Sequence, residues 1–231
     1  MPPEKNVVSF QSGIYLFPEF APEAKAAFSG REFEASKDLA LFLGCLGEKP
    51  ERSCTLNQVH GDQIVVVSGP VKEIEGDGLV TKEPNLALVV RTADCAPVFF
   101  YDSRCGAVGI CHAGWRGAKK GIIFRMIETL KREFDSDPSF LRVGIGPAIC
   151  DHCYEVGEEF EEYFPGWVKH ASEGFFFDLV GTIRKQLTLA GVDEESISDS
   201  NLCTACSMNR FFSARREGET AGRFLSVILL K

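Results

Sequence analysis

Three short stretches of the sequence place a histidine or a cysteine between an apolar run and a turn. They are "NQVHGDQ" with His60, "RTADCAPVFF" with Cys95 and "GICHAGWRG" with His112. Two imidazoles and one thiolate suit zinc, and three protein ligands leave the fourth tetrahedral position open for water or substrate. Such a zinc lowers the pKa of bound water to near neutral. If the three side chains converge, they predict a catalytic zinc site.

The spacing of these residues is also compatible with a second interpretation, in which they simply pack in the protein core. None of the three belongs to a short C-x-x-C or H-x-x-x-H pair, and a single buried cysteine usually serves packing. In the zinc interpretation, Asp94 or Asp62 orients one of the histidines through a hydrogen bond.

The segments around these residues have the pattern of strands. They are short, rich in β-branched and aromatic residues, and separated by Gly, Asp or Pro. The clearest are "QIVVVSG", "LALVVRT", "APVFFYD", "GAVGICHAG", "LRVGIGPAI" and "FLSVILL". "APVFFYD" and "GAVGICHAG" predict a hairpin that turns at residues 103–106, which brings His112 near Cys95 across neighbouring strands.

Helices are indicated where apolar residues recur every three or four positions. "RGAKKGIIFRMIETLKREF" predicts one amphipathic helix. "VGEEFEEYF" predicts a short helix, and "DLVGTIRKQLTLAG" predicts another, with Asp178 as its N-cap and Gly191 at its end. Because strands and helices are unevenly mixed, we expect an α+β fold with mixed β-sheets and flanking helices. No linker-like stretch divides residues 1–231, which predicts a single domain.

Composition limits the class of partner. The net charge of −8 argues against binding of nucleic acid, although a local basic pocket for a small anion is compatible with it. The sequence contains no run of about 18 apolar residues, so we expect no membrane span. The N-terminal residues lack the pattern of a signal peptide, so we expect the nine cysteines to be reduced thiols in a cytoplasm. No sequence pattern indicates the oligomeric state.

Six motifs together resemble one protein family. In chain order they are "NQVHGDQ", "GDGLVT", "RTADCAPVFFYD", "VGICHAGWRG", "VGIGPAI" followed by "CYEVG", and "FFSARREGETAGR". They resemble the multicopper polyphenol oxidase (laccase-domain) family, whose bacterial members are described as purine nucleoside phosphorylases or peptidoglycan editing factors. "ADC" followed by "HAGWRG" is the most specific part. The resemblance runs from about Thr55 to the C-terminus.

The resemblance implies a function and a site. It implies that His60, Cys95 and His112 bind Zn²⁺ and form the catalytic site. It also implies phosphorolysis of adenosine, inosine, guanosine and methylthioadenosine, and deamination of adenosine, with a purine nucleoside and phosphate as partners. A multicopper oxidase needs many more histidines than the four in this chain, so the ligand set favours a single-metal enzyme.

The N-terminal residues 1–54 are shortened and divergent relative to that family. Its members usually carry "FSTR-x-GG" and a later "N-x-G", whereas here "AFSGREF" is what corresponds to them. Arg31 matches the arginine of the first motif and is therefore a candidate for substrate binding.

Phosphorolysis requires a group that holds phosphate. Arg116 begins the helix predicted after "HAGWRG", where free N–H groups and the helix dipole favour an anion; a surface or capping role is the alternative. Trp115 either stacks on a base or packs the interior. Zinc deaminases use a glutamate as proton shuttle. No glutamate adjoins the three ligand candidates, which leaves Asp94, Asp77 or solvent for that step.

Two further features leave alternatives open. The pairs Cys150-x-x-Cys153 and Cys203-x-x-Cys206 look like a four-cysteine structural zinc site, with buried thiols as the alternative.

Two other functions of the protein are also compatible with the sequence. One is a cysteine hydrolase or amidase acting on peptidoglycan precursors, with Cys95 as nucleophile and His112 as its base. The other is a non-catalytic scaffold with a metal pocket.

Overall fold

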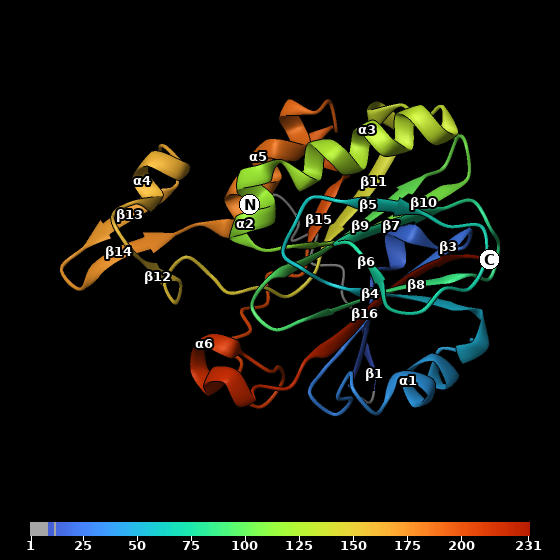
Figure 1. The fold of residues 1–231 in the computed structure, drawn as a ribbon, viewed down its shortest axis with the longest axis horizontal. Helices are drawn as coiled ribbons and strands as arrows, with labels where there is room; N and C mark the ends of the chain where they lie inside the picture. The colour runs from blue at the N-terminus through green and yellow to red at the C-terminus, as the bar shows by residue number, and fades with distance from the viewer. Residues whose placement is uncertain (1–8, 12) are drawn as a thin grey trace.

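The computed structural model describes residues 9–11 and 13–231. Two β-sheets lie face to face and helices cover their outer faces, so the chain forms four layers (Figure 1). This arrangement confirms the predicted α+β class with mixed sheets and flanking helices. Among the described residues, no helix has both the length and the apolar character needed to cross a bilayer.

The larger sheet has seven strands and contains the end of the chain at its centre. In spatial order the strands are β1 (Ser9–Gln11), β2 (Ile14–Leu16), β3 (Ala24–Ser29), β16 (Phe224–Leu230), β8 (Ala87–Thr92), β4 (Ser53–Asn57) and β6 (Ile74–Glu75). Strand β16 pairs antiparallel with β3 and β8, and all of its residues are buried. A continuous apolar run such as "FLSVILL" is typical of a strand covered on both faces.

The second sheet has six strands and carries the predicted hairpin. In spatial order they are β15 (Ile197–Asp199), β11 (Leu141–Ile145), β9 (Ala96–Asp102), β10 (Ala107–Ala113), β7 (Gly78–Thr81) and β5 (Ile64–Val66). Strands β9 and β10 pair Asp102 with Ala107 and Pro97 with His112, which confirms the hairpin and its turn at residues 103–106. The edge strands β15 and β5 run parallel to their neighbours, so the sheet is mixed.

Strand β9 shows how the core is divided between layers. Successive side chains of a strand point to opposite faces. Accordingly Phe99 and Tyr101 lie in the core between the two sheets, whereas Val98 and Phe100 lie in the core beneath the helices. A third apolar cluster joins the outer face of the seven-stranded sheet to Phe42 and other residues of helix α1 (Leu39–Cys45).

The helices largely follow the predictions, with one correction. They are α2 (Trp115–Lys120), α3 (Ile122–Phe134), α4 (Phe160–Tyr163), α5 (Leu179–Leu189) and α6 (Ala214–Glu217), with short 3-10 turns η1 (Pro18–Phe20), η2 (Pro50–Arg52), η3 (Pro138–Phe140), η4 (Glu194–Ser196) and η5 (Gly218–Thr220). The single helix predicted after His112 is two helices. Gly121, at φ 86°, ends α2 and precedes α3, because a left-handed residue terminates helical hydrogen bonding. Asp178 caps α5 as predicted, accepting from the Gly181 N–H at 2.8 Å.

A small three-stranded sheet extends from one end of the molecule. It consists of β12 (Glu155–Val156), β14 (Gly174–Phe177) and β13 (Val168–Ala171), and α4 lies beside it (Figure 1, left). Trp115 of α2 packs against Phe160 of α4, with ring centroids 5.0 Å apart, and so joins this extension to the main body. The sequence pattern predicts the short helix here but not the three strands.

Candidate active site

The structure brings together the three ligand candidates from distant parts of the chain. His60 lies in the loop before β5, Cys95 between β8 and β9, and His112 near the end of β10. One ligand atom from each residue lies within 4.8 Å of the others. The two imidazole rings meet edge to face, with centroids 4.7 Å apart. The convergence predicted from the strand ends is therefore present in the fold.

A buried carboxylate, Asp77, holds both histidine segments in place. The Nδ1 atom of His112 donates to Asp77 Oδ1 at 2.8 Å, which leaves Nε2 available as a metal ligand. The same carboxylate accepts the backbone N–H groups of Val59, His60 and Gly61 at 3.2, 3.0 and 2.6 Å. Burial by itself raises the pKa of Asp77, but these hydrogen bonds and His112 outweigh it and lower the pKa.

This role of Asp77 corrects the sequence-based expectation, which gave it to Asp94 or Asp62. Asp94 instead accepts hydrogen bonds from the Thr204 hydroxyl at 2.6 Å and the Arg215 N–H at 2.7 Å. Asp62 forms an ion pair with Arg125 at 3.5 Å. The reason is the order of strands: Asp77 immediately precedes β7, which pairs with β10 and so places the carboxylate beside His112.

Cys95 and His112 each shift the pKa of the other. Burial raises the pKa of Cys95, but His112 and His60 outweigh this effect and lower the pKa to about 6. Burial lowers the pKa of His112, but Cys95 and Asp77 outweigh it and raise the pKa to about 9. Both shifts favour a thiolate next to an imidazolium over the neutral pair. A glycine is required nearby, because a Cβ atom at Gly114 would lie 2.7 Å from the sulfur.

These residues lie in the wall of a cavity of about 560 Å³, within the range of about 300–1,000 Å³ typical of small-molecule sites. Four arginines line it, although the chain as a whole is acidic: Arg91, Arg116, Arg215 and Arg223. Trp115 and Tyr154 supply aromatic surface. The cavity thus combines a possible metal centre with local positive charge and flat apolar rings, a combination suited to an anionic group and an aromatic ring.

The two predicted substrate-binding arginines lie in different places. Arg116 lines the cavity, and its guanidinium lies 4.5 Å from the ring centroid of Trp115. Within the described part of the chain, the Arg116 side chain forms no hydrogen bond or ion pair with another residue. Arg31 is not part of the cavity lining. It donates to the Met208 carbonyl at 2.6 Å and lies 3.6 Å from Glu217.

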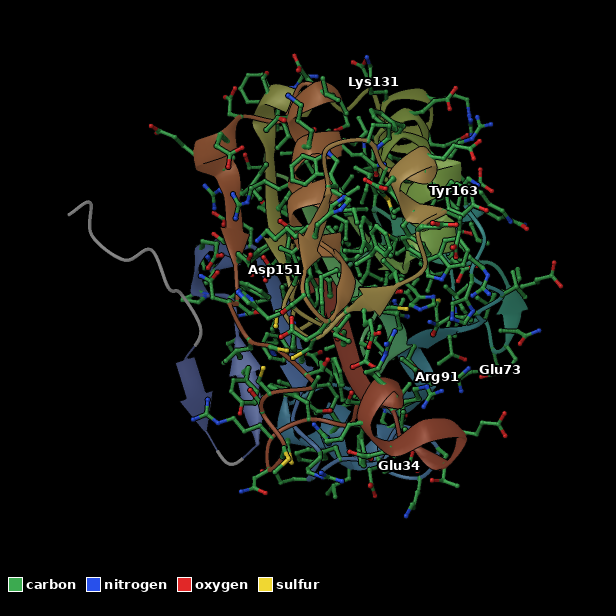
Figure 2. The ribbon with its side chains drawn as sticks, turned by 90° about the vertical axis from the view of Figure 1, so that its left-hand side faces the viewer. Glu34, Glu73, Arg91, Lys131, Asp151 and Tyr163 are labelled. Atoms are coloured by element: carbon green, nitrogen blue, oxygen red, sulfur yellow. The ribbon has the colours of Figure 1, made fainter. Side chains whose placement is uncertain are left out.

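Sequence reasoning did not identify Arg91 and Tyr154. Arg91 donates to the Leu56 carbonyl at 2.6 Å and pairs with Glu73 at 3.1 Å; Figure 2 shows Arg91 and Glu73 on the same side of the molecule. Burial and, to a smaller extent, the charge of Cys95 raise the pKa of Tyr154, so its phenol stays protonated. The signal for Arg91 was present, because it lies in the same "RTADC" motif as Cys95.

Trp115 has a packing role. Besides its contact with Phe160, its ring is stacked on Tyr163, with 6.1 Å between centroids and 5° between planes. Tyr163 is labelled on α4 in Figure 2. These two contacts agree with the packing interpretation of Trp115, which also contributes to the cavity lining.

The donor set fits a zinc ion. Two imidazoles and one thiolate would supply three ligands, the carboxylate of Asp77 orients one imidazole, and all three ligand candidates line the cavity. Catalytic zinc sites share these properties.

Comparisons with known proteins identify a family and several relatives. A family described as multi-copper polyphenol oxidoreductase laccase matches residues 32–231. A purine nucleoside phosphorylase of Clostridium acetobutylicum is 38% identical over 181 residues, covering 76% of each chain. An adenosine deaminase, RL5, from an unknown prokaryotic organism is 36% identical over 168 residues, covering 68% of this chain and 64% of that one.

Solved structures resemble the whole fold. The crystal structure of the hypothetical protein YfiH of Bacillus licheniformis has a TM-score of 0.90 and 28% identity, covering 98% of this chain and 100% of that one. The family match begins at residue 32 and so includes part of the segment that the motifs alone left divergent. The chain therefore belongs to the multi-copper polyphenol oxidoreductase laccase family.

Proposed function

We propose that this chain is a cytoplasmic, zinc-dependent purine nucleoside phosphorylase that acts on adenosine, inosine, guanosine and methylthioadenosine, and that it also deaminates adenosine. The observation that carries the proposal is the convergence of His60, Cys95 and His112 within 4.8 Å, in a cavity that arginines line. The names of the phosphorylase and deaminase relatives support it.

In phosphorolysis, a phosphate oxygen forms a bond to the anomeric carbon of the ribose while the bond from that carbon to the purine nitrogen breaks. We assign the phosphate to Arg116, since its guanidinium forms no hydrogen bond or ion pair with the residues that the structure describes, and arginine binds phosphate through two parallel hydrogen bonds. Helix α2 has six residues, so the side chain rather than the helix terminus is the anion-binding group. We assign proton donation to the departing purine to the phenol of Tyr154, because this residue lines the cavity and its raised pKa keeps it protonated.

In deamination, water adds to C6 of adenine and ammonia leaves. A zinc ion held by His60, Cys95 and His112 would supply Lewis acidity for such an addition. Asp77 holds the His112 ring with Nε2 available. The oxygens of both Asp77 and Asp94 already accept hydrogen bonds, so we assign proton transfer to solvent in the cavity.

The test is turnover by the purified protein with zinc. We expect inosine and inorganic phosphate to give hypoxanthine and ribose 1-phosphate, and adenosine to release ammonia. A chelator should abolish both reactions and added zinc should restore them. His60→Ala, Cys95→Ala and His112→Ala should each lose activity, whereas His170→Ala, at an exposed residue hydrogen-bonded to Glu161, should retain it. Zinc-loaded protein that converts none of the four nucleosides would contradict the proposal.

One observation favours a second candidate function, a cysteine hydrolase or amidase acting on peptidoglycan precursors. The Cys95 thiolate beside the His112 imidazolium is the pair that such an enzyme uses, the sulfur attacking a carbonyl carbon and the imidazolium protonating the leaving amine. A chelator should spare this activity, whereas alkylation of Cys95 should abolish it.

A further inference from the structure

A second cluster of metal-ligating side chains lies outside the cavity described above. Cys150 and Cys153 lie in the loop after β11, and Cys203 and Cys206 lie in the loop after β15. Their four sulfur atoms all lie within 4.8 Å of one another. The sulfur of Cys206 is 3.2 Å from that of Cys153 and 4.0 Å from that of Cys150. Asp151, labelled in Figure 2, marks the position of the first pair in the molecule.

The backbone holds the two loops in this arrangement. Ala148 and Cys203 form a parallel bridge, in which the Ala148 N–H donates to the Leu202 carbonyl at 3.2 Å and the Thr204 N–H donates to the Ala148 carbonyl at 3.1 Å. The bridge continues the parallel pairing of β11 with β15. Backbone pairing therefore holds the starts of the two cysteine-bearing loops side by side, independently of any contact between sulfurs.

Hydrogen bonds also point at one of the sulfurs. The backbone N–H groups of Cys150 and Cys206 both donate to the Cys203 sulfur, at 3.3 and 3.4 Å. Donors directed at a thiol favour its charged form, which is the form that binds metal.

Ordinary packing does not account for these four thiols. A free cysteine usually behaves as a small buried hydrophobe, as Cys54 and Cys111 do within the apolar clusters. By contrast, Cys206 is exposed and the other three are only half-buried. None of the four belongs to the apolar clusters formed by the described residues.

We propose that Cys150, Cys153, Cys203 and Cys206 bind a second, structural zinc ion. Two C-x-x-C pairs give the four thiolates of a closed tetrahedral site, which has no open position for substrate. The proposal does not depend on the proposed enzyme activity, because it concerns different ligands and a different ion.

The site would join the loops that form one wall of the cavity. Tyr154 directly follows Cys153, and Thr204 directly follows Cys203 and donates to Asp94. Arg216 donates to the carbonyls of Thr204 and Ala205, both at 2.8 Å. Zinc bound here therefore fixes Tyr154 and the segment carrying Arg215 relative to the strand end that carries Cys95.

The first measurement is the zinc content of the full-length protein, purified with a thiol reductant, by elemental analysis. We expect two zinc ions per chain in the wild type. The double variant His60→Ala/His112→Ala should keep one, and Cys153→Ser/Cys206→Ser should also keep one. Cys45→Ser, at an exposed cysteine of α1, should keep both. A wild-type protein whose zinc is lost entirely in the histidine variant would overturn the proposal.

Three further measurements cover other outcomes. In the histidine double variant, cobalt should give the intense absorption of tetrahedral thiolate coordination, and its absence would contradict the site. The single variant Cys206→Ser alters the most exposed ligand, so we expect it to fold and to bind this zinc at least ten-fold more weakly in a chelator competition. Titration of the unfolded, chelated protein should detect all nine thiols, whereas two fewer would indicate a Cys153–Cys206 disulfide in place of zinc.

Discussion

At the scale of single residues, the candidate metal centre depends on Asp77 as much as on its ligands. Asp77 is fully buried and accepts hydrogen bonds from His112 and from three consecutive backbone N–H groups, among them that of His60. A single carboxylate thus sets the orientation of one ligand and the backbone position of another. The sequence offered Asp77 only as a candidate for proton transfer, because "GDG" is typical of a turn and does not indicate a carboxylate that orients a histidine.

We predict that Asp77→Asn weakens zinc binding roughly 10–100-fold, the range seen when a partner of a metal-bound histidine is removed. The amide nitrogen of asparagine cannot accept the backbone N–H groups, and His112 loses its ionised partner. Affinity is measured by competition with a chelator of known affinity. Asp62→Asn is the matched control, since its carboxylate pairs with Arg125 instead. Equal affinities of the two variants would show that Asp77 does not position the site.

At the scale of elements, the β9–β10 hairpin positions both Cys95 and His112, and Asp102 closes its turn. Asp102 accepts from the N–H groups of Arg104 and Cys105 at 2.8 and 3.1 Å, and from the Ser136 hydroxyl at 2.5 Å. Burial raises the pKa of Asp102, but these hydrogen bonds outweigh it and lower the pKa. The ionised side chain therefore stabilises the folded hairpin and ties it to the end of α3.

We predict that Asp102→Asn lowers the free energy of unfolding by about 1–3 kcal/mol at pH 7, the cost of unsatisfied buried groups. A depressed folded-state pKa contributes stability that is present above the unfolded pKa of about 3.9 and is lost as the pH falls through the folded pKa. The difference between wild type and variant should therefore shrink below about pH 4.

Urea unfolding at a series of pH values provides the measurement. Asp193→Asn is the control, because Asp193 is exposed and its side chain makes no capping hydrogen bond. A variant whose stability differs from wild type by the same amount at every pH would contradict the assigned role of Asp102.

The break between α2 and α3 is decided at this scale too. Apolar periodicity runs through Gly121 without interruption, and a glycine within a helix is tolerated, so the sequence predicts one helix. The structure ends α2 there, because Arg116 and Trp115 must face the cavity and α4 while α3 packs on the sheet. One straight helix could not direct side chains to the cavity and α4 and also pack along the sheet, so the chain changes direction between α2 and α3.

At the scale of the whole molecule, an aromatic layer holds the two sheets together. Phe99 of β9 is fully buried, and its ring lies 5.4 Å from that of Phe17, with centroids as reference points. Phe28 and Phe224 of the opposite sheet belong to the same cluster. Because β9 leads from Cys95 into this layer, the rigidity of the site depends on the contact between sheets.

We predict that Phe99→Ala lowers the free energy of unfolding by about 3–5 kcal/mol, the cost of deleting a buried aromatic ring. Phe124→Ala on α3 is the control, since 41% of that residue is exposed, and its effect should stay within about 0.5 kcal/mol. Denaturant unfolding measures both. Similar losses in the two variants would show that the layer between the sheets does not dominate stability.

The predictability of the fold varied along the chain for a physical reason. Strands β8, β9, β10 and β16 are long, apolar and bounded by turn residues, so their sequences alone indicate them. Strands β12, β13 and β14 have two to four residues each and show little burial pattern. Segments this short form strands because neighbours pair with them, which a local pattern does not record.

By itself, the sequence determined the kinds of chemistry available: two histidines and a cysteine at strand ends, two C-x-x-C pairs, and the hairpin that brings Cys95 to His112. Only the tertiary structure decided that Asp77, rather than Asp94 or Asp62, supports the histidine, and that Arg116 but not Arg31 lines the cavity. Residue type and local periodicity are properties of neighbouring positions. Which carboxylate or arginine reaches the site depends on strand order and loop packing, which are set by contacts between distant segments.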